Sequence, residues 1–426
     1  MLTLPFPDPV LLDRDDPLRR FRERFELPRA PDGSAAAVYL CGNSLGPMPH
    51  AVRMLLGETL DDWATLGVRG HHEGARPWIP YAGTLVAPMA ALVGADPLDV
   101  VLMNTLTANL HLLMASFYRP TPTRYAVLIE SGAFPSDQYA IDSQLRFHGQ
   151  DPAAALITVA PRPGEDLLRT GDIVAQIEAN AGRLALVLLP GVQYRTGQVL
   201  DIAGISAAAR AGGAVVGWDL AHAVGNIPLS LDAWDIDFAV WCTYKYLCGG
   251  PGAIGGAYVS RRYRDAFAGP RLAGWWGHDA ATRFAMGAEF RPMTGAAGWQ
   301  LSNPPILATA PLSIALALFA EAGMQSLRMK SVALTGFAQT ALAARLGGEI
   351  ECITPAAPGE RGCQLSLRVR GGRDRARRVF TQLGLRGVIG DWREPDVIRI
   401  APHPLYNTFG DVAAALDILA ELVACN

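Results

Sequence analysis

The sequence predicts an α/β protein with a mainly parallel sheet in a large domain, followed by a smaller α+β domain. Between residues 100 and 260, short runs rich in Val, Ile and Leu alternate with helical segments, which is typical of a parallel sheet covered on both faces. After residue 306, a long helical stretch precedes three separate strand-like runs. The 426 residues are enough for two domains and a substantial core.

The N-terminal elements come first. Residues 1–38 are expected to form an extended or short-helical arm, because prolines crowd the beginning of this segment. A short strand over 38–41 ends at Gly42-Asn43-Ser44-Leu45-Gly46, which is either only a turn or a way to bring Asn43 or Ser44 to a ligand. A helix is expected over 51–66 and a loop over 71–78.

The large domain alternates strands and helices. Strands are expected over 100–103, 125–129, 155–159, 184–189, 214–218, 238–242 and 256–260, and helices over 110–117, 171–180 and 203–211. The turn over 104–109, which carries hydroxyl groups, is either a phosphate cradle or an ordinary N-cap. The domains are expected to be an arm over 1–50 that contributes to the small domain, a large domain over 51–305 and a small domain over 306–426.

The small domain is expected to begin with a long helical stretch over 306–346. Its strands are predicted over 349–353, 363–369 and 397–401. Arg399 lies in the otherwise apolar last strand, where an unpaired charge is costly. Either a bidentate contact with a substrate carboxylate or a structural salt bridge would pair it.

Composition excludes several classes of function. Half of the residues are hydrophobic, 18% are charged and the net charge is -3, so nothing favours nucleic acid or an anionic membrane. The six cysteines form no C-x-x-C pair, no metal site is expected, and His71-His72 is weak as a metal pair. With no signal peptide or membrane-spanning run, we expect a reduced, cytoplasmic setting.

Two strand ends carry the chemistry. Asp219 follows the strand over 214–218, and Lys245 follows the strand over 238–242. Ligands bind at such strand ends in α/β sheets. A lysine there can form a Schiff base with an aldehyde cofactor, and an aspartate can hold a pyridinium nitrogen protonated, which is the pyridoxal phosphate (PLP) arrangement. The alternative is a solvated lysine and a helix-capping aspartate.

A second motif suggests a different cofactor. Gly250-Pro251-Gly252-Ala253-Ile254-Gly255 fits the G-x-G-x-x-G pattern of nicotinamide cofactor sites. That pattern must open a helix, whereas this segment leads into the strand over 256–260, and Pro251 lacks the N–H that a phosphate cradle needs. We therefore do not expect a dinucleotide.

Taken in order, the motifs resemble kynureninase, a PLP-dependent family of the aspartate aminotransferase superfamily (fold type I). The resemblance rests on Gly42 to Gly46, Asn104 to Leu113, Ala133 to Asp137, Asp219 to Ala223, Tyr244 to Leu247, Gly274 to His278, Ser302 to Pro305 and Arg399 to Pro402. It implies a seven-stranded, mainly parallel sheet and hydrolysis of the Cβ–Cγ bond of L-kynurenine, L-3-hydroxykynurenine or both, within tryptophan degradation or biosynthesis of NAD or secondary metabolites.

The resemblance also implies roles for single residues. Lys245 would form the Schiff base, Asp219 would pair with the pyridinium nitrogen, and Tyr244 with Lys245 would return a proton. The cofactor site would comprise Leu106, Thr107, Phe134, Asp137, Asp219, His222, Tyr244, Lys245, Trp275 and Asn303. The substrate site would comprise Arg399 at the α-carboxylate, together with Ser44, His71, Ser302 and Asn303. The active sites would lie at a homodimer interface, with Trp275 and Asn303 coming from the partner subunit.

The chain departs from the family pattern at two positions, and two other functions are alternatives to this interpretation. Pro190 stands where the family often has a hydroxyl residue, which removes a phosphate contact of about 1 kcal/mol. Trp276 stands where phenylalanine is common. A cysteine desulfurase-like lyase would need a mobile nucleophilic cysteine, whereas Cys352 and Cys363 are predicted within strands. A cofactor-binding protein without turnover is the other rival.

Overall fold

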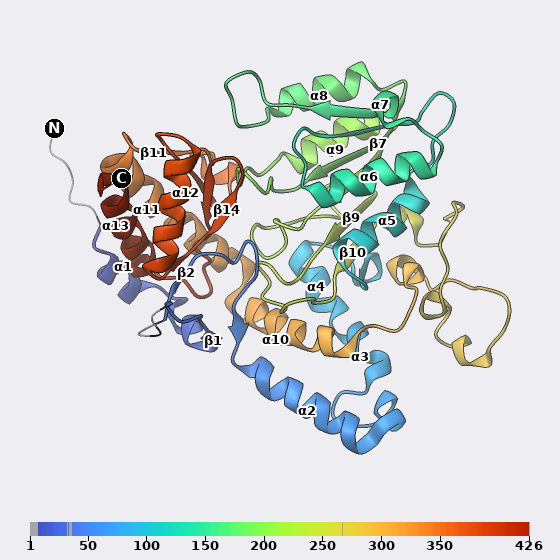
Figure 1. Cartoon of the computed structure of the whole chain (residues 1–426). Coiled ribbons are helices and arrows are strands. Elements are labelled where there is room, and N and C mark those ends of the chain that lie inside the picture. Colours follow the sequence, from blue (N-terminus) through green and yellow to red (C-terminus); the bar gives the residue numbers. More distant parts are fainter. Residues whose placement is uncertain (1–6, 32, 34–35, 266, 426) are drawn as a thin grey trace.

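The computed structural model describes residues 7–31, 33, 36–265 and 267–425. The chain forms a large and a small body (Figure 1). The large body holds the central sheet and its helices, coloured from cyan to yellow. The small body holds the red and most of the orange C-terminal elements, whereas the orange helix α10 lies with the large body, and the blue N-terminal arm begins beside the small body.

The large body is built on a seven-stranded sheet with the order β4-β10-β9-β8-β7-β5-β6. Its strands are β4 (Val100–Leu102), β5 (Ala126–Glu130), β6 (Leu156–Val159), β7 (Leu184–Pro190), β8 (Val215–Asp219), β9 (Phe238–Trp241) and β10 (Gly256–Val259). Within this described sheet only β10 runs antiparallel to its neighbours. The mainly parallel sheet is therefore confirmed, and the ends of the predicted strands lie within one residue of the observed ones.

Both faces of this sheet are buried, as its apolar strands require. Along β5, Ala126 and Leu128 face one helical layer, and Val127 and Ile129 face the other. The first layer contains α4 (Val86–Val93), α8 (Thr170–Ala179), α9 (Ile202–Ala211) and α10 (Ile306–Ala322). The second contains α5 (Leu106–Phe117), α6 (Pro135–Phe147) and α7 (Pro152–Ala155). The helix α5 begins four residues before the predicted start, because Leu106 already follows the extended N-cap residue Thr105.

The N-terminal arm is short-helical and then extended. It comprises α1 (Pro9–Asp15), a 3-10 turn (Arg19–Arg24), β1 (Phe25–Glu26), β2 (Val38–Tyr39) and β3 (Met48–Pro49). Pro5 lies outside the described residues. The strand β2 pairs in parallel with β13 (Val388–Ile389), which ties the arm to the small body. The predicted helix over 51–66 is confirmed as α2 (Ala51–Leu66), and α3 (Trp78–Thr84) follows.

The long helical stretch expected over 306–346 is confirmed, but it is divided into two helices. The segment forms α10 and α11 (Met324–Leu346), which are bent by 81° relative to each other. Gly323 has a φ of 75°, a conformation that glycine adopts without strain, and the helix is broken at this residue. Among the described residues no single helix has the length and apolar composition to cross a membrane, and α10 and α11 meet that test only as a bent pair.

The small body contains an antiparallel sheet with the order β11-β12-β15-β14. Its strands are β11 (Ile350–Cys352), β12 (Leu365–Val369), β14 (Asp391–Arg393) and β15 (Val397–Ile400), and α12 (Arg373–Leu385) and α13 (Phe409–Cys425) accompany it. Leu365, Leu367 and Ile398 pack with α11, α12 and α13 in one core. Because side chains alternate, the other face of this sheet carries Ser366, Arg368 and Arg399.

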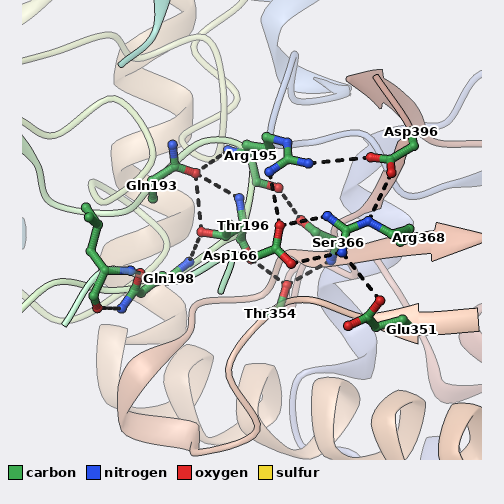
Figure 2. Close-up of polar contacts among 11 residues, drawn as sticks. Asp166, Gln193, Arg195, Thr196, Gln198, Glu351, Thr354, Ser366, Arg368 and Asp396 are labelled. Atoms are coloured by element: carbon green, nitrogen blue, oxygen red, sulfur yellow. Dashed lines mark hydrogen bonds and ion pairs between the residues drawn. The ribbon is translucent and has the colours of Figure 1, made fainter. Parts of the chain in front are cut away.

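This polar face meets a loop of the large body (Figure 2). Arg368 donates hydrogen bonds to Asp166 at 2.7 and 2.9 Å and to Asp396 at 3.0 Å, and Arg195 lies within 3.4 Å of the same two carboxylates. The Ser366 hydroxyl donates to the Arg195 carbonyl at 2.6 Å. The two bodies are thus joined by paired charges next to the strand that carries Arg399.

Candidate active site

A cavity opens where the parallel strands β5, β7 and β8 end. Including its open mouth, it has a volume of about 750 Å³. It brings together eight residues of the predicted cofactor site: Leu106, Thr107, Phe134, Asp137, Asp219, His222, Tyr244 and Lys245. Strand β8 lies beside β9, with Asp219 paired to Val240, so the two loops that carry the acid and the lysine are neighbours.

Lys245 lies in a tight turn held from the N-terminal arm. The Gly46 N–H donates to the Tyr244 carbonyl at 2.8 Å, and a Cβ at Gly46 would come within 2.6 Å of the Lys245 carbonyl oxygen. Only glycine fits this approach, which explains the Gly42 to Gly46 motif. The Lys245 Nζ lies 3.0 Å from His222 Nε2 and 5.8 Å from the centre of the Phe134 ring.

The small number of lysines in the chain distinguishes Lys245. The chain contains only two lysines, Lys245 and Lys330. Lys330 is buried in an ion pair with Asp16, at 2.7 Å. Lys245 is therefore the one lysine whose amine faces the cavity, and the scarcity of lysine is a sequence signal that supports its assignment independently of its motif.

Three carboxyl groups share the cavity floor. Asp219 accepts a hydrogen bond from the Ala221 N–H at 2.7 Å, and no helix begins there. Burial, followed by the charge and hydrogen bond of Asp219, raises the pKa of Asp137 well above its usual range. Burial also raises the pKa of Glu130 to about 8, with the Asp219 charge adding to the rise and the Gln193 hydrogen bond opposing it. At neutral pH the Glu130 carboxyl therefore holds its proton, and Asp137 holds its proton more tightly than an ordinary aspartate does.

His222 is a neutral base beside the lysine. Burial and the charge of Lys245 lower the pKa of this imidazole well below its usual range. Its Nδ1 lies 3.4 Å from the Tyr246 hydroxyl, and its Nε2 faces the Lys245 amine. A neutral imidazole in this place can accept a proton or a hydrogen bond from the amine.

The far end of the cavity suits an anion. The helices α5 and α6 both begin there without side-chain caps, so their first N–H groups and their dipoles favour negative charge. The Thr107 and Ser136 hydroxyls lie 2.7 Å apart and bridge the two helix starts. Pro190 also lines this cavity and offers neither an N–H nor a hydroxyl.

Arg399 lies next to the cavity but does not line it. It is fully buried, donates to the Tyr194 carbonyl at 2.5 Å, and pairs with Asp391 at 2.6 Å. The structural salt bridge considered from the sequence therefore exists. Its Nε is buried without a hydrogen-bond partner, so the guanidinium keeps a free donor. Ser44 donates to the same Asp391 at 2.8 Å, so both residues meet at one carboxylate.

Four predicted residues lie away from the cavity of this chain. His71 packs edge-on against Trp78, at 5.3 Å between ring centres. Trp275 is 42% exposed and donates to the Arg283 carbonyl at 3.1 Å. Ser302 and Asn303 are exposed on the segment before α10. One chain therefore does not gather the whole predicted site.

Comparison with known proteins decides the family. Curated proteins named kynureninase from Koribacter versatilis and Xanthomonas oryzae pv. oryzae are 53% and 55% identical to this chain, over 94% of it and 94% of each relative. A family model of the kynureninase C-terminal domain matches residues 327–419. The chain belongs to the kynureninase family. The resemblance drawn from the ordered motifs is confirmed.

Solved structures confirm the fold type I architecture. A cysteine desulfurase from Thermococcus onnurineus superposes with a TM-score of 0.75 and 16% identity over all of both chains. A cystine C-S lyase superposes with a TM-score of 0.75 and 17% identity over 92% of this chain and 99% of that one. At these identities the likeness shows the fold alone. No described cysteine lines the cavity.

The cysteine thiols that a desulfurase-like activity would need are also unsuited to act as nucleophiles in this chain. Burial raises the pKa of Cys363 to about 12, and it raises the pKa of Cys352 as well. Cys363 precedes β12 rather than lying in it, so its predicted place in a strand is wrong, but it is buried all the same. The side chain of Cys425 lies outside the described residues.

The cavity of this kynureninase family member fits PLP. An amine, a carboxylate, an aromatic face and an anion-binding end are the groups that PLP requires. Asp137 Oδ1 is buried without a hydrogen-bond partner and faces this space. The segment 250–255 leads directly into β10, as predicted, and does not open a helix as a dinucleotide motif would.

The family departure at Trp276 has a local partner. The Arg283 guanidinium lies 4.3 Å from the centre of the Trp276 ring and donates to the Trp276 carbonyl at 2.6 Å. Tryptophan is the ring that attracts cations most strongly. The larger ring thus holds Arg283 inside the loop that carries Trp275.

Several residues of the site were not predicted. Glu130 at the end of β5, Ser136 in α6 and Tyr194 after β7 line the cavity, Gln193 donates a hydrogen bond to Glu130, and Asp391 pairs with Arg399. Ser136 stands in one of the family motifs, and Gln193 and Tyr194 lie three and four residues after Pro190, so closeness to these positions could have found them. Asp391 could not be found this way, because β14 has no apolar pattern.

Glu130→Gln is expected to change how stability depends on pH. The folded protein holds the Glu130 proton more tightly than the unfolded chain, because the pKa is raised to about 8. The resulting stabilisation is complete below about pH 4 and is lost as pH rises through 8, at about 1.4 kcal/mol per unit of pKa shift. Glutamine mimics the protonated acid and keeps the Gln193 contact, so it should stabilise the cofactor-free protein at pH 9 much more than at pH 5.

Thermal unfolding of the wild type and Glu130→Gln at both pH values measures this difference. The exposed Glu178→Gln is the control and should show the same small change at both. An equal change in Tm for Glu130→Gln at pH 5 and pH 9 would contradict the protonated state.

Proposed function

We propose that this protein hydrolyses the Cβ–Cγ bond of L-kynurenine, L-3-hydroxykynurenine or both, with PLP as cofactor. The products are anthranilate or 3-hydroxyanthranilate and L-alanine. One observation carries the proposal: the Lys245 amine faces Asp219, His222 and Phe134 in one cavity of a chain that matches kynureninases along nearly its whole length. The chemistry requires a lysine and an acid in this arrangement.

The residues of the cavity divide the work on the cofactor. When bound, PLP supplies the electron sink that cleavage beside a γ-carbonyl needs. Asp219 would hold the pyridinium nitrogen, Phe134 would cover the ring, and Asp137 and His222 would contact its polar edge. The phosphate would lie at the uncapped helix starts, against Leu106, Thr107 and Tyr244.

The residues of the turn that carries Lys245 would also carry out the proton transfers. Lys245 would remove the Cα proton of the substrate, and the neutral His222 can accept a hydrogen bond from the Lys245 amine at 3.0 Å. Tyr244 and Lys245 are the donors for the final proton at Cβ. Burial raises the pKa of Tyr244 above its usual range, so its hydroxyl keeps its proton until it is needed.

The substrate would extend from Arg399 to the partner subunit. Arg399 would bind the α-carboxylate, with Ser44 bonded to the shared Asp391. His71, Ser302 and Asn303 would meet the aryl end, where they can hydrogen-bond a ring hydroxyl. Trp275 and Asn303 would come from the partner, which accounts for their exposure in one chain.

A homodimer completes this site. An apolar groove is lined by Trp63 of α2, Trp78 of α3 and Ile306 and Leu307 of α10, next to the exposed Asn303. Met54, Leu60 and Trp63 of α2 are 66%, 48% and 61% exposed. Exposed apolar surface of this kind marks a protein interface. The second copy of this chain is its occupant in this proposal, because the site lacks its aryl end without it.

Trp63→Arg is expected to weaken dimerisation by roughly tenfold or more, since a buried aromatic at an interface often dominates its energy. Analytical ultracentrifugation over a range of concentrations would measure it, and activity should fall at concentrations where the variant is monomeric. Leu385→Arg is the matched control, because Leu385 is 62% exposed on α12 of the small body. If both variants dimerise equally well, α2 is not part of the dimer interface.

Two further features belong to this proposal. The division into 1–50, 51–305 and 306–426 is supported by the separate cores of the two bodies and by the β2–β13 pairing of the arm. A cytoplasmic location is supported by the free thiols of the five described cysteines, which suit a reducing compartment.

Product analysis tests the proposed reaction. The purified, PLP-loaded protein would be given L-kynurenine and L-3-hydroxykynurenine side by side, and the aromatic acid and alanine would be quantified. Equal yields of the two products are expected, and the ratio of kcat/KM values assigns the preferred substrate. No alanine from either substrate, with cofactor bound, would refute the proposal.

A further inference from the structure

A second arginine lies beside Arg399 on the polar face of the small sheet. Asp391 pairs with Arg399 in the register of β14 and β15, and Arg393 follows two residues later on β14. Residues two apart on a strand point the same way, so Asp391 and Arg393 share one face. Trp392, between them, points to the opposite face and packs against Phe380 of α12.

These two guanidinium groups share one carboxylate. Asp391 Oδ2 lies 2.6 Å from Arg399 Nη2 and 3.1 Å from Arg393 Nη2. Among the described residues, neither arginine has an ion pair with any other carboxylate. Two positive charges against one negative charge leave the cluster one anion short.

Both guanidiniums also keep a free donor. The Nε atoms of Arg393 and Arg399 are buried without hydrogen-bond partners. A buried unpaired donor is unfavourable, and a carboxylate accepts guanidinium hydrogen bonds with good geometry. The charge balance and the free donors therefore indicate the same kind of ligand.

The cluster adjoins the proposed substrate cavity. Arg399 Nη1 donates to the carbonyl of Tyr194, whose ring lines the cavity and packs edge-on against Phe134. The charge of Arg393 acts on Tyr194 and on His222, which also lines the cavity. The Arg393 side chain is 33% exposed, whereas that of Arg399 is 0% exposed, so Arg393 is the one that an entering ligand can reach.

We propose that Arg393 is a second residue that binds the substrate α-carboxylate, together with Arg399. This inference rests on the proposed function, in which Arg399 binds that group. The carboxylate would lie between the two guanidiniums and neutralise the charge that Asp391 leaves. Arg393, which is the exposed member, would contact it first and hold it against the buried Arg399.

The test compares two small ligands on the PLP-loaded enzyme. L-Alanine carries the carboxylate and L-alaninamide lacks it, and the change in visible absorbance of the cofactor reports the binding of each. In Arg393→Gln, the preference for L-alanine over L-alaninamide should fall by roughly tenfold or more, because charge-assisted hydrogen bonds are lost. Binding of the amide should change little. Arg393→Lys, which keeps the charge without the forked donors, should lose less of the preference.

Arg377→Gln is the matched control. Arg377 is exposed on α12 and lies 5.1 Å from the Trp392 ring, on the other face of the same strand, so its loss should leave the preference unchanged. An unchanged preference in Arg393→Gln, beside a collapse in Arg399→Gln, would overturn the role of Arg393 and leave the proposed function intact. An unchanged preference in both variants would refute the carboxylate site itself. If Arg393→Gln does not fold, the preference for L-alanine over L-alaninamide is measured in Arg393→Lys instead, and an unchanged preference there would overturn the role of Arg393.

Discussion

Replacing Lys245 with alanine is expected to lower kcat by at least about 10³-fold. General acid–base catalysis alone accounts for about 10²–10⁴-fold, and this lysine also provides the covalent attachment of the cofactor. No other amine can replace it, because Lys330, the second of the two lysines, is held by Asp16. Steady-state product formation measures the loss, and the visible absorbance of the bound cofactor should shift or disappear.

Chemical trapping separates this effect from misfolding. Borohydride reduction of the PLP-loaded wild type, followed by peptide mass spectrometry, should label the peptide that contains Lys245 and leave the Lys330 peptide unlabelled. Lys330→Arg is the control variant, because it keeps the charge opposite Asp16 and touches no cavity residue. Label on Lys330, or a Lys245→Ala variant with activity near that of the wild type, would contradict the assignment.

Asp219→Asn is expected to reduce kcat by about 10²–10³-fold, the range found when one aligned electrostatic group is removed from an active site. The asparagine amide can still accept the Ala221 N–H at the position of Oδ1, so the turn keeps its shape. It cannot keep a pyridinium nitrogen protonated, and the electron sink is weakened. Rates with L-kynurenine at saturating PLP measure the loss.

The control for this variant is an aspartate that caps a helix outside the cavity. Asp201 accepts a backbone hydrogen bond from Gly204 at 2.9 Å at the start of α9, and it does not line the cavity. Asp201→Asn preserves that cap and should keep activity within about twofold, since asparagine caps helices as well as aspartate. A pH titration of the cofactor absorbance would show the altered nitrogen in Asp219→Asn. Identical titrations in the two variants would place the pyridinium elsewhere.

The electrostatics explain why both substitutions act on one unit. Burial and the charge of Asp219 raise the pKa values of the two neighbouring acids, Asp137 and Glu130. Removing the charge of Asp219 therefore alters its neighbours as well. For this reason we expect the effects of Asp219→Asn and Asp137→Asn to be far from additive.

Local pattern in the sequence determined the strands, the mainly parallel sheet and the two chemical residues. Alternation of apolar runs and helices places the ends of the strands of the large sheet within a residue, because side-chain periodicity is a property of neighbouring residues. Asp219 and Lys245 were recognisable for the same reason, since Asp219 ends β8 and Lys245 lies in the turn after β9. The residues of the segment 250–255 also argued against a dinucleotide site, because such a motif must open a helix and this segment was predicted to lead into a strand.

Tertiary structure alone decided which of these residues meet. The pairing of β8 with β9 brings Asp219 to the lysine turn, and the small sheet presents Arg399 to Asp391, a residue from an edge strand without apolar pattern. The protonation of Glu130 depends on burial and on Asp219, which is distant in sequence. The course of α11 after Gly323 is also tertiary, because the helix leaves the core of the large body and packs from Leu334 onward in the core of the small body. Each of these features arises from contacts between distant segments, and such contacts leave no periodic signal in the chain itself.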